Sequence, residues 1–149
     1  MRQRGGHAKG PGSRNSGNGA SDRQQTGLWG ERQAERYLRR SGYRILGRRV
    51  RVGRRDEIDL LMRTRDTLIF VEVKTRRDET FARAAAAVDR HKRHVLSRAA
   101  VRYLQRLRRK PPYIRFDVVE VVGKPDGGKP LIRHLENVFP LDSCYSLQW

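Results

Sequence analysis

The sequence predicts one α/β domain, in which helices flank a mixed sheet of about five strands in the order α-β-β-β-α-β-β. Residues 57–63 and 68–74 alternate in polarity as two strands of a hairpin do, and helical periodicity occurs both before and after them. The 149 residues are 36% hydrophobic and 34% charged, which suffices for one core and hardly for two.

The first 26 residues contain six glycines and almost no apolar side chain, so we expect a disordered basic tail at 1–26 and a single domain at 27–149. The tail either adds nonspecific affinity for nucleic acid or is only a solvated extension.

A first helix is expected from about residue 26 to a glycine cap at Gly42. Its apolar stripe comprises Leu28, Ala34 and Leu38. Glu31 falls near the middle of that stripe, so either it lies at the wet end of the helix or it serves a site.

The next stretch, residues 43–52, is rich in β-formers and should pair with the hairpin, with a bulge or bend at Gly47. Several arginines surround it: Arg48, Arg49, Arg51, Arg54 and Arg55. They either line the approach of a phosphate backbone or simply solvate a strand edge.

The hairpin at residues 56–74 should have two different faces. One face is apolar and predicts a core: Ile58, Leu60, Met62, Ile69, Val71 and Val73. The other is charged at one end and apolar at the other: Glu57, Asp59, Leu61, Leu68, Phe70, Glu72 and Lys74. A merely solvated face would be polar throughout.

A turn centred on residues 65–66 would place Asp59 opposite Glu72. Two carboxylates that close should share a proton or hold a cation, and together with the Val73 carbonyl they suit Mg²⁺. Lys74 would then stand where a phosphate oxygen or an attacking water sits. The alternative is a surface ion network in which Glu57 pairs with Lys74.

Helical patterns return in residues 81–87 and again from an N-cap at Asp89 to about residue 109, before two prolines. Lys92 lies on the apolar stripe of the second helix and points either to the site or, by snorkelling, to water. His91 and His94 are expected on a solvated basic face, because no cysteine or third histidine lies near them in sequence. Residues 113–122 and 131–138 predict two further strands, and 140–149 show no period.

Charge and composition favour a polyanionic partner inside the cell. The chain carries +18, and because the first 26 residues contain five basic and one acidic residue, the rest keeps +14. Cys144 is the sole cysteine, and no apolar run is long enough for a membrane span or a secretion signal. We therefore expect a cytoplasmic protein with no membrane partner.

Asp59, twelve intervening residues and then Glu72-Val-Lys74 resemble the metal-binding signature of the restriction endonuclease-like, or PD-(D/E)XK, nuclease superfamily. A wider series over residues 27–140 resembles the YraN-like family of small bacterial proteins. Its motifs are Gly30-Glu31 with Ala34 and Leu38, Gly42-Tyr43-Arg-Ile-Leu46, Glu57-Ile-Asp-Leu60, Phe70-Val-Glu-Val-Lys-Thr-Arg76, Phe116-Asp-Val-Val119 and His134-Leu-Glu-Asn-Val-Phe139. Asp56 departs from the small residue, often glycine, expected before Glu57, and adds negative charge near the site.

The resemblance implies a restriction endonuclease-like core and an Mg²⁺- or Mn²⁺-dependent nuclease. Asp59 and Glu72 would hold the metal with the Val73 carbonyl, Lys74 would orient water, Glu57 would tune the pair, and Glu31 would assist. Phosphate contacts are expected from Arg54, Arg55, Arg76, Lys92 and Arg93. DNA is favoured over RNA as the substrate, and monomer and homodimer both stay open. The alternatives are a nucleic-acid-binding module that no longer turns over and a basic accessory factor of membrane or ribosome.

Overall fold

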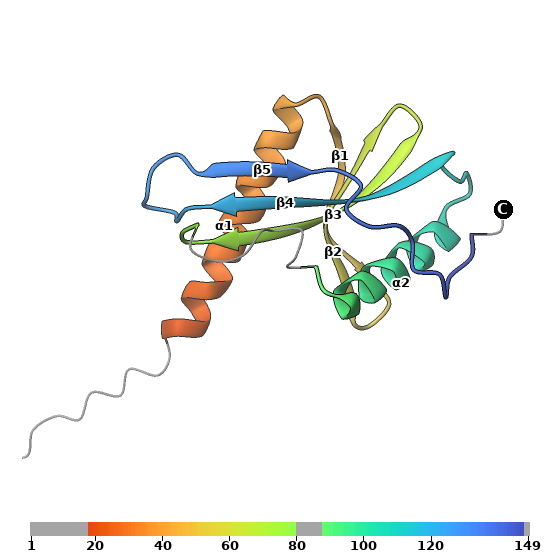
Figure 1. The fold of residues 1–149 in the computed structure, drawn as a ribbon, viewed down its shortest axis with the longest axis horizontal. Helices are drawn as coiled ribbons and strands as arrows, with labels where there is room; N and C mark the ends of the chain where they lie inside the picture. The colour runs from red at the N-terminus through yellow and green to blue at the C-terminus, as the bar shows by residue number, and fades with distance from the viewer. Residues whose placement is uncertain (1–17, 80–87, 148–149) are drawn as a thin grey trace, which may run out of the picture.

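The computed structural model describes residues 18–79 and 88–147, so most of the expected tail and the expected helix at 81–87 lie outside the described residues. The elements are α1 (Asn18–Arg40), β1 (Arg44–Val52), β2 (Asp56–Thr64), β3 (Thr67–Arg76), α2 (Arg90–Arg106), β4 (Tyr113–Val122) and β5 (Leu131–Leu135) (Figure 1). They form one mixed five-stranded sheet in the order β1-β2-β3-β4-β5, in which only β3 and β4 run parallel. The predicted fold class and element order are confirmed.

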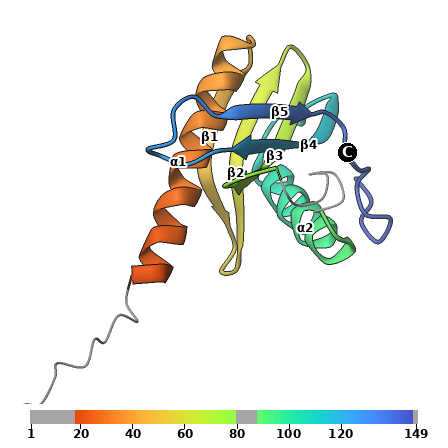
Figure 2. The same ribbon diagram turned by 60° about the vertical axis from the view of Figure 1, so that its left-hand side comes forward.

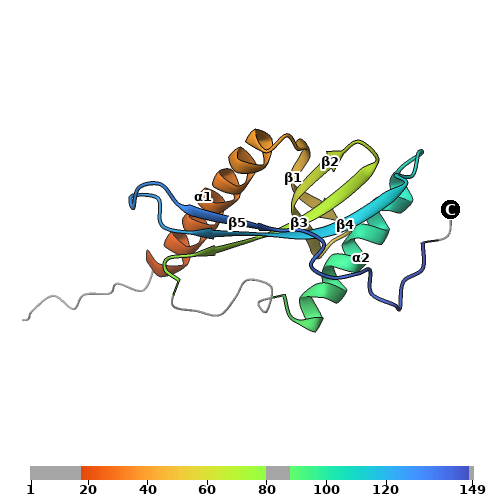
Figure 3. The same cartoon turned by 45° about the horizontal axis from the view of Figure 1, so that its top comes forward.

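The two helices cover opposite faces of the sheet (Figure 3). The cluster under α1 comprises Ala34, Leu38, Leu60, Met62, Ile69, Val71, Val119 and Val121. The cluster under α2 includes Leu61, Leu68, Phe70, Leu96, Ala99, Ala100, Leu104 and Phe116. The centre of the sheet is therefore buried on both sides, which explains the unbroken apolar run at residues 68–71 of β3 and the valine pairs at 118–119 and 121–122 of β4.

The β2–β3 hairpin has the predicted register. Leu60 pairs with Val71 and Leu61 with Phe70, down to Thr64 with Thr67 across a two-residue turn. The ladder ends at the pair Leu60–Val71, and beyond it residues 56–58 of β2 pair only with β1. The bulge expected at Gly47 is also present, as a register shift between Ile45 and Gly47.

Ile58 corrects the predicted face assignment. It was expected beside Leu60 and Met62 under α1, but it packs with Leu61 and Phe70 in the cluster under α2. Strict alternation fails because β2 leaves β3 at this point, and the change in strand direction rotates the side chains that follow.

The first helix begins at Asn18, well before residue 26 where it was expected, so residues 18–26 are helical rather than part of a disordered tail. No proline interrupts that stretch, and extending a formed helix is cheaper than nucleating one. Asp22 also forms an ion pair with Arg77 beyond the end of β3, which ties the added turns to the sheet. The helix ends as predicted: its last residue is Arg40, and Gly42 follows two positions later at φ 91°.

The second helix has the predicted N-cap: the Asp89 side chain accepts a hydrogen bond from Lys92 N at 2.8 Å. It ends at Arg106 rather than near residue 109. At this end Lys110 Nζ donates to the carbonyls of Leu104 and Leu107. Neither this helix nor any other in the described ranges is long and apolar enough to cross a membrane.

Strand β5 ends at Leu135 instead of Val138, because Asn137 turns away with φ 50° and donates its N–H to Asp117 Oδ1 at 2.9 Å. Asp117 is buried and also binds Arg115 through both carboxylate oxygens and His134 Nε2 at 2.8 Å. These partners hold the pKa of Asp117 below its ordinary value, despite the burial that raises it.

The negative charge that Asp56 adds before Glu57 is balanced by arginines of α2. The Asp56 carboxylate is buried against α2, where Arg98 binds both oxygens at 2.7 and 2.9 Å and Arg102 lies 3.2 Å away. Hydrogen bonding to Arg98 is the main cause that lowers the pKa of Asp56. This ion pair fastens the start of β2 to α2.

We expect Asp56→Asn to destabilise the protein at neutral pH by about 1–3 kcal/mol, since the hydrogen bonds to a charged group are weakened. The folded-state pKa is below the unfolded one, so this contribution is present above about pH 4 and disappears as the pH falls through the folded-state pKa. Urea unfolding at pH 7 and pH 3 measures it, with the exposed Asp126→Asn as control. An Asp56→Asn loss that is equal at both pH values would contradict the ionic origin.

Candidate active site

Asp59 stands where β2 parts from β3. Its Oδ2 accepts a hydrogen bond from the Val73 backbone N–H at 2.8 Å. A carbonyl of β2 would fill that role in a continued ladder, so the carboxylate takes over a sheet hydrogen bond. The expected ladder pairs of Asp59 with Glu72 and Glu57 with Lys74 are therefore absent from the described register, yet Asp59 remains close enough to Glu72 for their charges to interact.

Burial is the largest cause that raises the pKa of Asp59 to about 7, and the negative charge of Glu72 raises it further. The Val73 N–H and the Lys92 ammonium oppose the shift, while Glu31 adds to it. The carboxyl therefore exchanges a proton near neutral pH, as expected where carboxylates crowd together.

Glu72 is buried, with 4% of its surface exposed, and two lysines contact it. Lys74 Nζ lies 3.0 Å from Oε1 and Lys92 Nζ lies 3.1 Å from Oε2. Oε2 nevertheless has no hydrogen bond within the described structure. The Lys92 ammonium is close enough for charge attraction but poorly directed for a hydrogen bond, which leaves a buried anionic oxygen able to accept a further cation.

Glu31 is half-buried on α1 and lies within the field of the same acids. Burial raises its pKa, and so do Glu57 and Glu72, whereas Arg49 lowers it. The helix comes close to the sheet here because residue 30 is glycine: a Cβ there would lie 1.8 Å from Thr75 Oγ1. Gly30 thus lets α1 carry Glu31 to the edge of β3.

A cleft of about 330 Å³ lies between α1 and the end of β3. It is lined by Arg23, Thr26, Gly27, Glu31, Val73, Thr75 and Arg77. Arg23 was assigned to the disordered tail, and Thr75 and Arg77 were not proposed as site residues. Only a correct start of the first helix would have indicated Arg23.

The surface-network alternative required an ion pair between Glu57 and Lys74, but Glu57 pairs with arginines of β1 instead. It accepts a hydrogen bond from Arg49 Nε at 3.0 Å and lies 3.6 Å from Arg51 Nε. Arg49 lies in β1 between the paired residues Arg48 and Val50 and has a φ of 44°. Its charge interacts with Glu31 and Asp59 as well. Glu57 therefore acts on the acid cluster through its charge and through Arg49.

The five expected phosphate-binding residues have different surroundings. Arg54 and Arg55 are exposed and line a hollow of about 420 Å³ with Gly53, Arg98 and Arg102. Arg76 lies 3.4 Å from Glu120. Arg93 donates to the Val88 carbonyl and stacks over Phe139. Lys92 joins the acid cluster instead.

These residues fit a hard divalent ion. Asp59 and Glu72 offer carboxylate oxygens, one of them buried without a hydrogen bond, and the Val73 carbonyl belongs to the residue whose N–H binds Asp59. Displacing a proton from a carboxyl whose pKa is about 7 costs little at neutral pH.

The model of the uncharacterised protein family UPF0102 matches residues 30–121. A UPF0102 protein from Symbiobacterium thermophilum is 45% identical over 115 residues, which cover 77% of this chain and 96% of the relative. Others from Syntrophomonas wolfei and Porphyromonas gingivalis are 43% and 39% identical, covering 77% and 81% of this chain and 97% and 88% of the relatives. The match spans α1 to β4 and includes Glu31, Asp59, Glu72 and Lys74.

Asp59→Asn should stabilise the metal-free protein at pH 8 by a few kcal/mol and change little at pH 4. The folded-state pKa of Asp59 is above the unfolded one, so the wild type loses stability as the pH rises from about 4 through 7, at about 1.36 kcal/mol per pKa unit. The amide still accepts from Val73 N without the charge. Urea unfolding in EDTA measures the difference, with the exposed Asp66→Asn as control. A variant less stable than wild type at pH 8 would contradict it.

Proposed function

The chain belongs to the uncharacterised protein family UPF0102, and from that premise we propose that it is a divalent-metal-dependent nuclease that hydrolyses phosphodiester bonds of DNA. Membership bears out the resemblance to the YraN-like family. The observation that supports the activity most is the pair of half-buried Asp59 and buried Glu72, with Lys74 Nζ 3.0 Å from Glu72 and a pKa of Asp59 of about 7.

Asp59, Glu72 and the Val73 carbonyl would hold Mg²⁺ or Mn²⁺, whose preferred ligands are oxygens. When bound, such an ion supplies Lewis-acid polarisation of a phosphoryl oxygen and lowers the pKa of water. The Val73 N–H keeps the Asp59 carboxylate oriented, as an outer hydrogen bond does for metal ligands in general.

Lys74 and Lys92 balance the charge of the acids and provide ammonium groups for the extra negative charge that develops on a phosphate during hydrolysis. Glu31 lines the cleft beside Val73, and burial raises its pKa, which makes it a stronger proton acceptor for a water in the cleft. Glu57 keeps Arg49 in place, and Arg49 in turn moderates the pKa of Glu31.

The phosphate backbone would be held by the positive charge around this site. The chain carries +18, and Arg23 and Arg77 line the same cleft as Glu31. Arg54 and Arg55 offer a second basic hollow just before β2 begins. Neutralising phosphates releases counterions, so this binding weakens with salt and carries no sequence information by itself.

A second candidate is a nucleic-acid-binding module of the same fold that does not cleave. The observation that favours it is the double pairing of Glu72, because the ammonium groups of Lys74 and Lys92 already neutralise the carboxylate that a metal would require. The two candidates differ in whether a divalent ion can bind the acid pair while the Lys92 ammonium lies 3.1 Å from Glu72 Oε2.

Cleavage is tested with the purified protein on labelled linear, nicked, flapped and branched DNA and on matched RNA, with Mn²⁺, with Mg²⁺ and with EDTA. Cleavage of DNA should require the metal and fall by at least about 100-fold in Asp59→Asn, Glu72→Gln and Lys74→Ala. Binding should persist or strengthen in the two acid variants, because negative charge is removed. Asp66→Asn is the matched control. Activity of Glu72→Gln equal to wild type would refute the site, and binding without cleavage under every condition would favour the silent module.

Lys92→Met should raise Mn²⁺ affinity at the acid pair, because it removes a positive charge 3.1 Å from Glu72 Oε2 and keeps the aliphatic stem. We expect about 10-fold tighter binding, equivalent to about 1.4 kcal/mol. Electron paramagnetic resonance of free Mn²⁺ measures it. Arg90→Met, an exposed change on the first turn of the same helix, should leave the affinity unchanged. Weaker Mn²⁺ binding in Lys92→Met would place the metal elsewhere.

A further inference from the structure

The C-terminal segment, residues 140–147, runs beside α2 (Figure 2). Leu141 and Leu147 pack at the border of the core under that helix. The Asp142 N–H donates to the hydroxyl of Ser97, which is buried, at 3.0 Å. The segment is therefore fixed against α2, although its sequence shows no strand or helix period.

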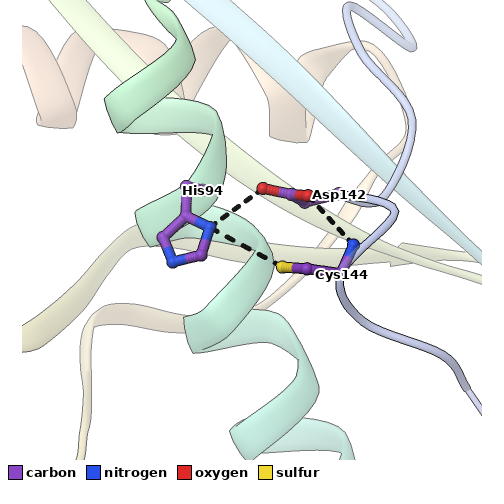
Figure 4. Close-up of side chains that lie close together, drawn as sticks. All are labelled: His94, Asp142 and Cys144. Atoms are coloured by element: carbon purple, nitrogen blue, oxygen red, sulfur yellow. Dashed lines mark hydrogen bonds and ion pairs between the residues drawn. The ribbon is translucent and has the colours of Figure 1, made fainter.

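Three different metal-ligating side chains converge where this segment meets the helix (Figure 4). His94 Nδ1 lies 2.9 Å from Asp142 Oδ2 and 3.8 Å from Cys144 Sγ. All three ligand atoms lie within 4.8 Å of one another. The sequence places no cysteine near His94, but the fold brings Cys144 to it from 50 positions away.

The two distances from the His94 ring nitrogen are close to those of a tetrahedral metal site. Nitrogen and oxygen ligands at about 2.0–2.1 Å and sulfur at about 2.3 Å from Zn²⁺ stand about 3.3–3.6 Å apart from one another. The contacts of 2.9 and 3.8 Å here differ from that range by only a few tenths of an ångström. A simple ion pair between His94 and Asp142 would not need the thiol on the same ring nitrogen.

The surroundings hold these ligands in place. Tyr145 Oη lies 3.3 Å from His94 Nε2, the ring nitrogen that faces away from the other two ligands. A proton on Nε2 directed at that hydroxyl leaves Nδ1 free to bind a metal, as outer-sphere partners of ligating histidines do. The Cys144 N–H donates to Asp142 Oδ1 at 3.1 Å, so the carboxylate presents Oδ2 to the histidine.

We propose that His94, Asp142 and Cys144 form a second metal site, of the zinc class and distinct from Asp59 and Glu72. Nitrogen and thiolate ligands select Zn²⁺ or Co²⁺ over Mg²⁺. Binding releases the Cys144 thiol proton to solvent, and water completes the fourth position, since the cysteine is exposed. The bound ion clasps the C-terminal segment to the helix that carries Lys92, and this inference stands whether or not the protein is a nuclease.

The test titrates the full-length protein, freed of metal with a chelator, with Co²⁺ and follows the near-ultraviolet absorption of cobalt–thiolate bonds. The wild type should show this band, and Zn²⁺ but not excess Mg²⁺ should abolish it by displacement. Cys144→Ser should lose the band, and His94→Gln and Asp142→Asn should weaken Co²⁺ affinity by at least about 10-fold. Tyr145→Phe should weaken it by less.

Two controls separate this site from other binding. His91→Gln removes an exposed histidine from the same helix, and Asp59→Asn removes a ligand from the acid pair; both should keep the wild-type band and affinity. Circular dichroism checks that each variant is folded. No band in the wild type, a band that persists in Cys144→Ser, or an equal loss in His91→Gln would each overturn the proposal.

Discussion

The hydrogen bond from the Val73 N–H to the Asp59 carboxylate is the interaction on which the acid cluster depends. A side chain here replaces a main-chain acceptor, so β2 can leave β3 without orphaning a buried donor. Because β2 separates from β3 here, the end of the hairpin is open. The hydrogen bond to Val73 N–H holds the Asp59 carboxylate in that opening. Without it, Asp59 would lie in a regular ladder directly across from Glu72 on a flat sheet, where two facing carboxylates are unfavourable.

The cluster is an arrangement of opposite charges brought in from three elements. The hairpin supplies Asp59, Glu72 and Lys74, α2 supplies Lys92, and α1 supplies Glu31 through the close approach at Gly30. Each charge is tolerated because another lies near it, and the raised pKa of Asp59 marks where that compensation is incomplete. Structural ion pairs such as Asp56 with Arg98 differ, because there hydrogen bonding outweighs burial and the pKa falls. The pKa of Asp59 is thus raised where burial outweighs its partners, and the pKa of Asp56 is lowered where hydrogen bonding to Arg98 outweighs burial.

Patterns among neighbouring residues predicted much of this structure. Contacts between residues far apart in the sequence could not be predicted in this way. Alternation in the hairpin gave its register, Gly47 its bulge and Asp89 its helix cap, since each depends on a few neighbouring residues. Ile58 was assigned to the wrong face because alternation assumes a straight strand. The predicted start of α1 came too late because residues 18–26 contain almost no apolar side chain, so no periodic stripe marks them as helical. The contact of His94 with Asp142 and Cys144 carries no periodic signal, and spans 48 and 50 positions.

The parallel pair β3–β4 has a consequence for the order of folding. The hairpin of β2 and β3 closes through a two-residue turn, and such hairpins form in about 1–10 μs. Pairing of Thr67 with Tyr113 must instead await closure of the whole crossover that contains α2, which is intrinsically slower. The nascent chain therefore acquires Asp59 and Glu72 on one local unit before Lys92 arrives to neutralise them. During that interval the two acids interact without their helix-borne counter-charge, so a divalent cation that binds there would act on the folding protein as well as on the finished one.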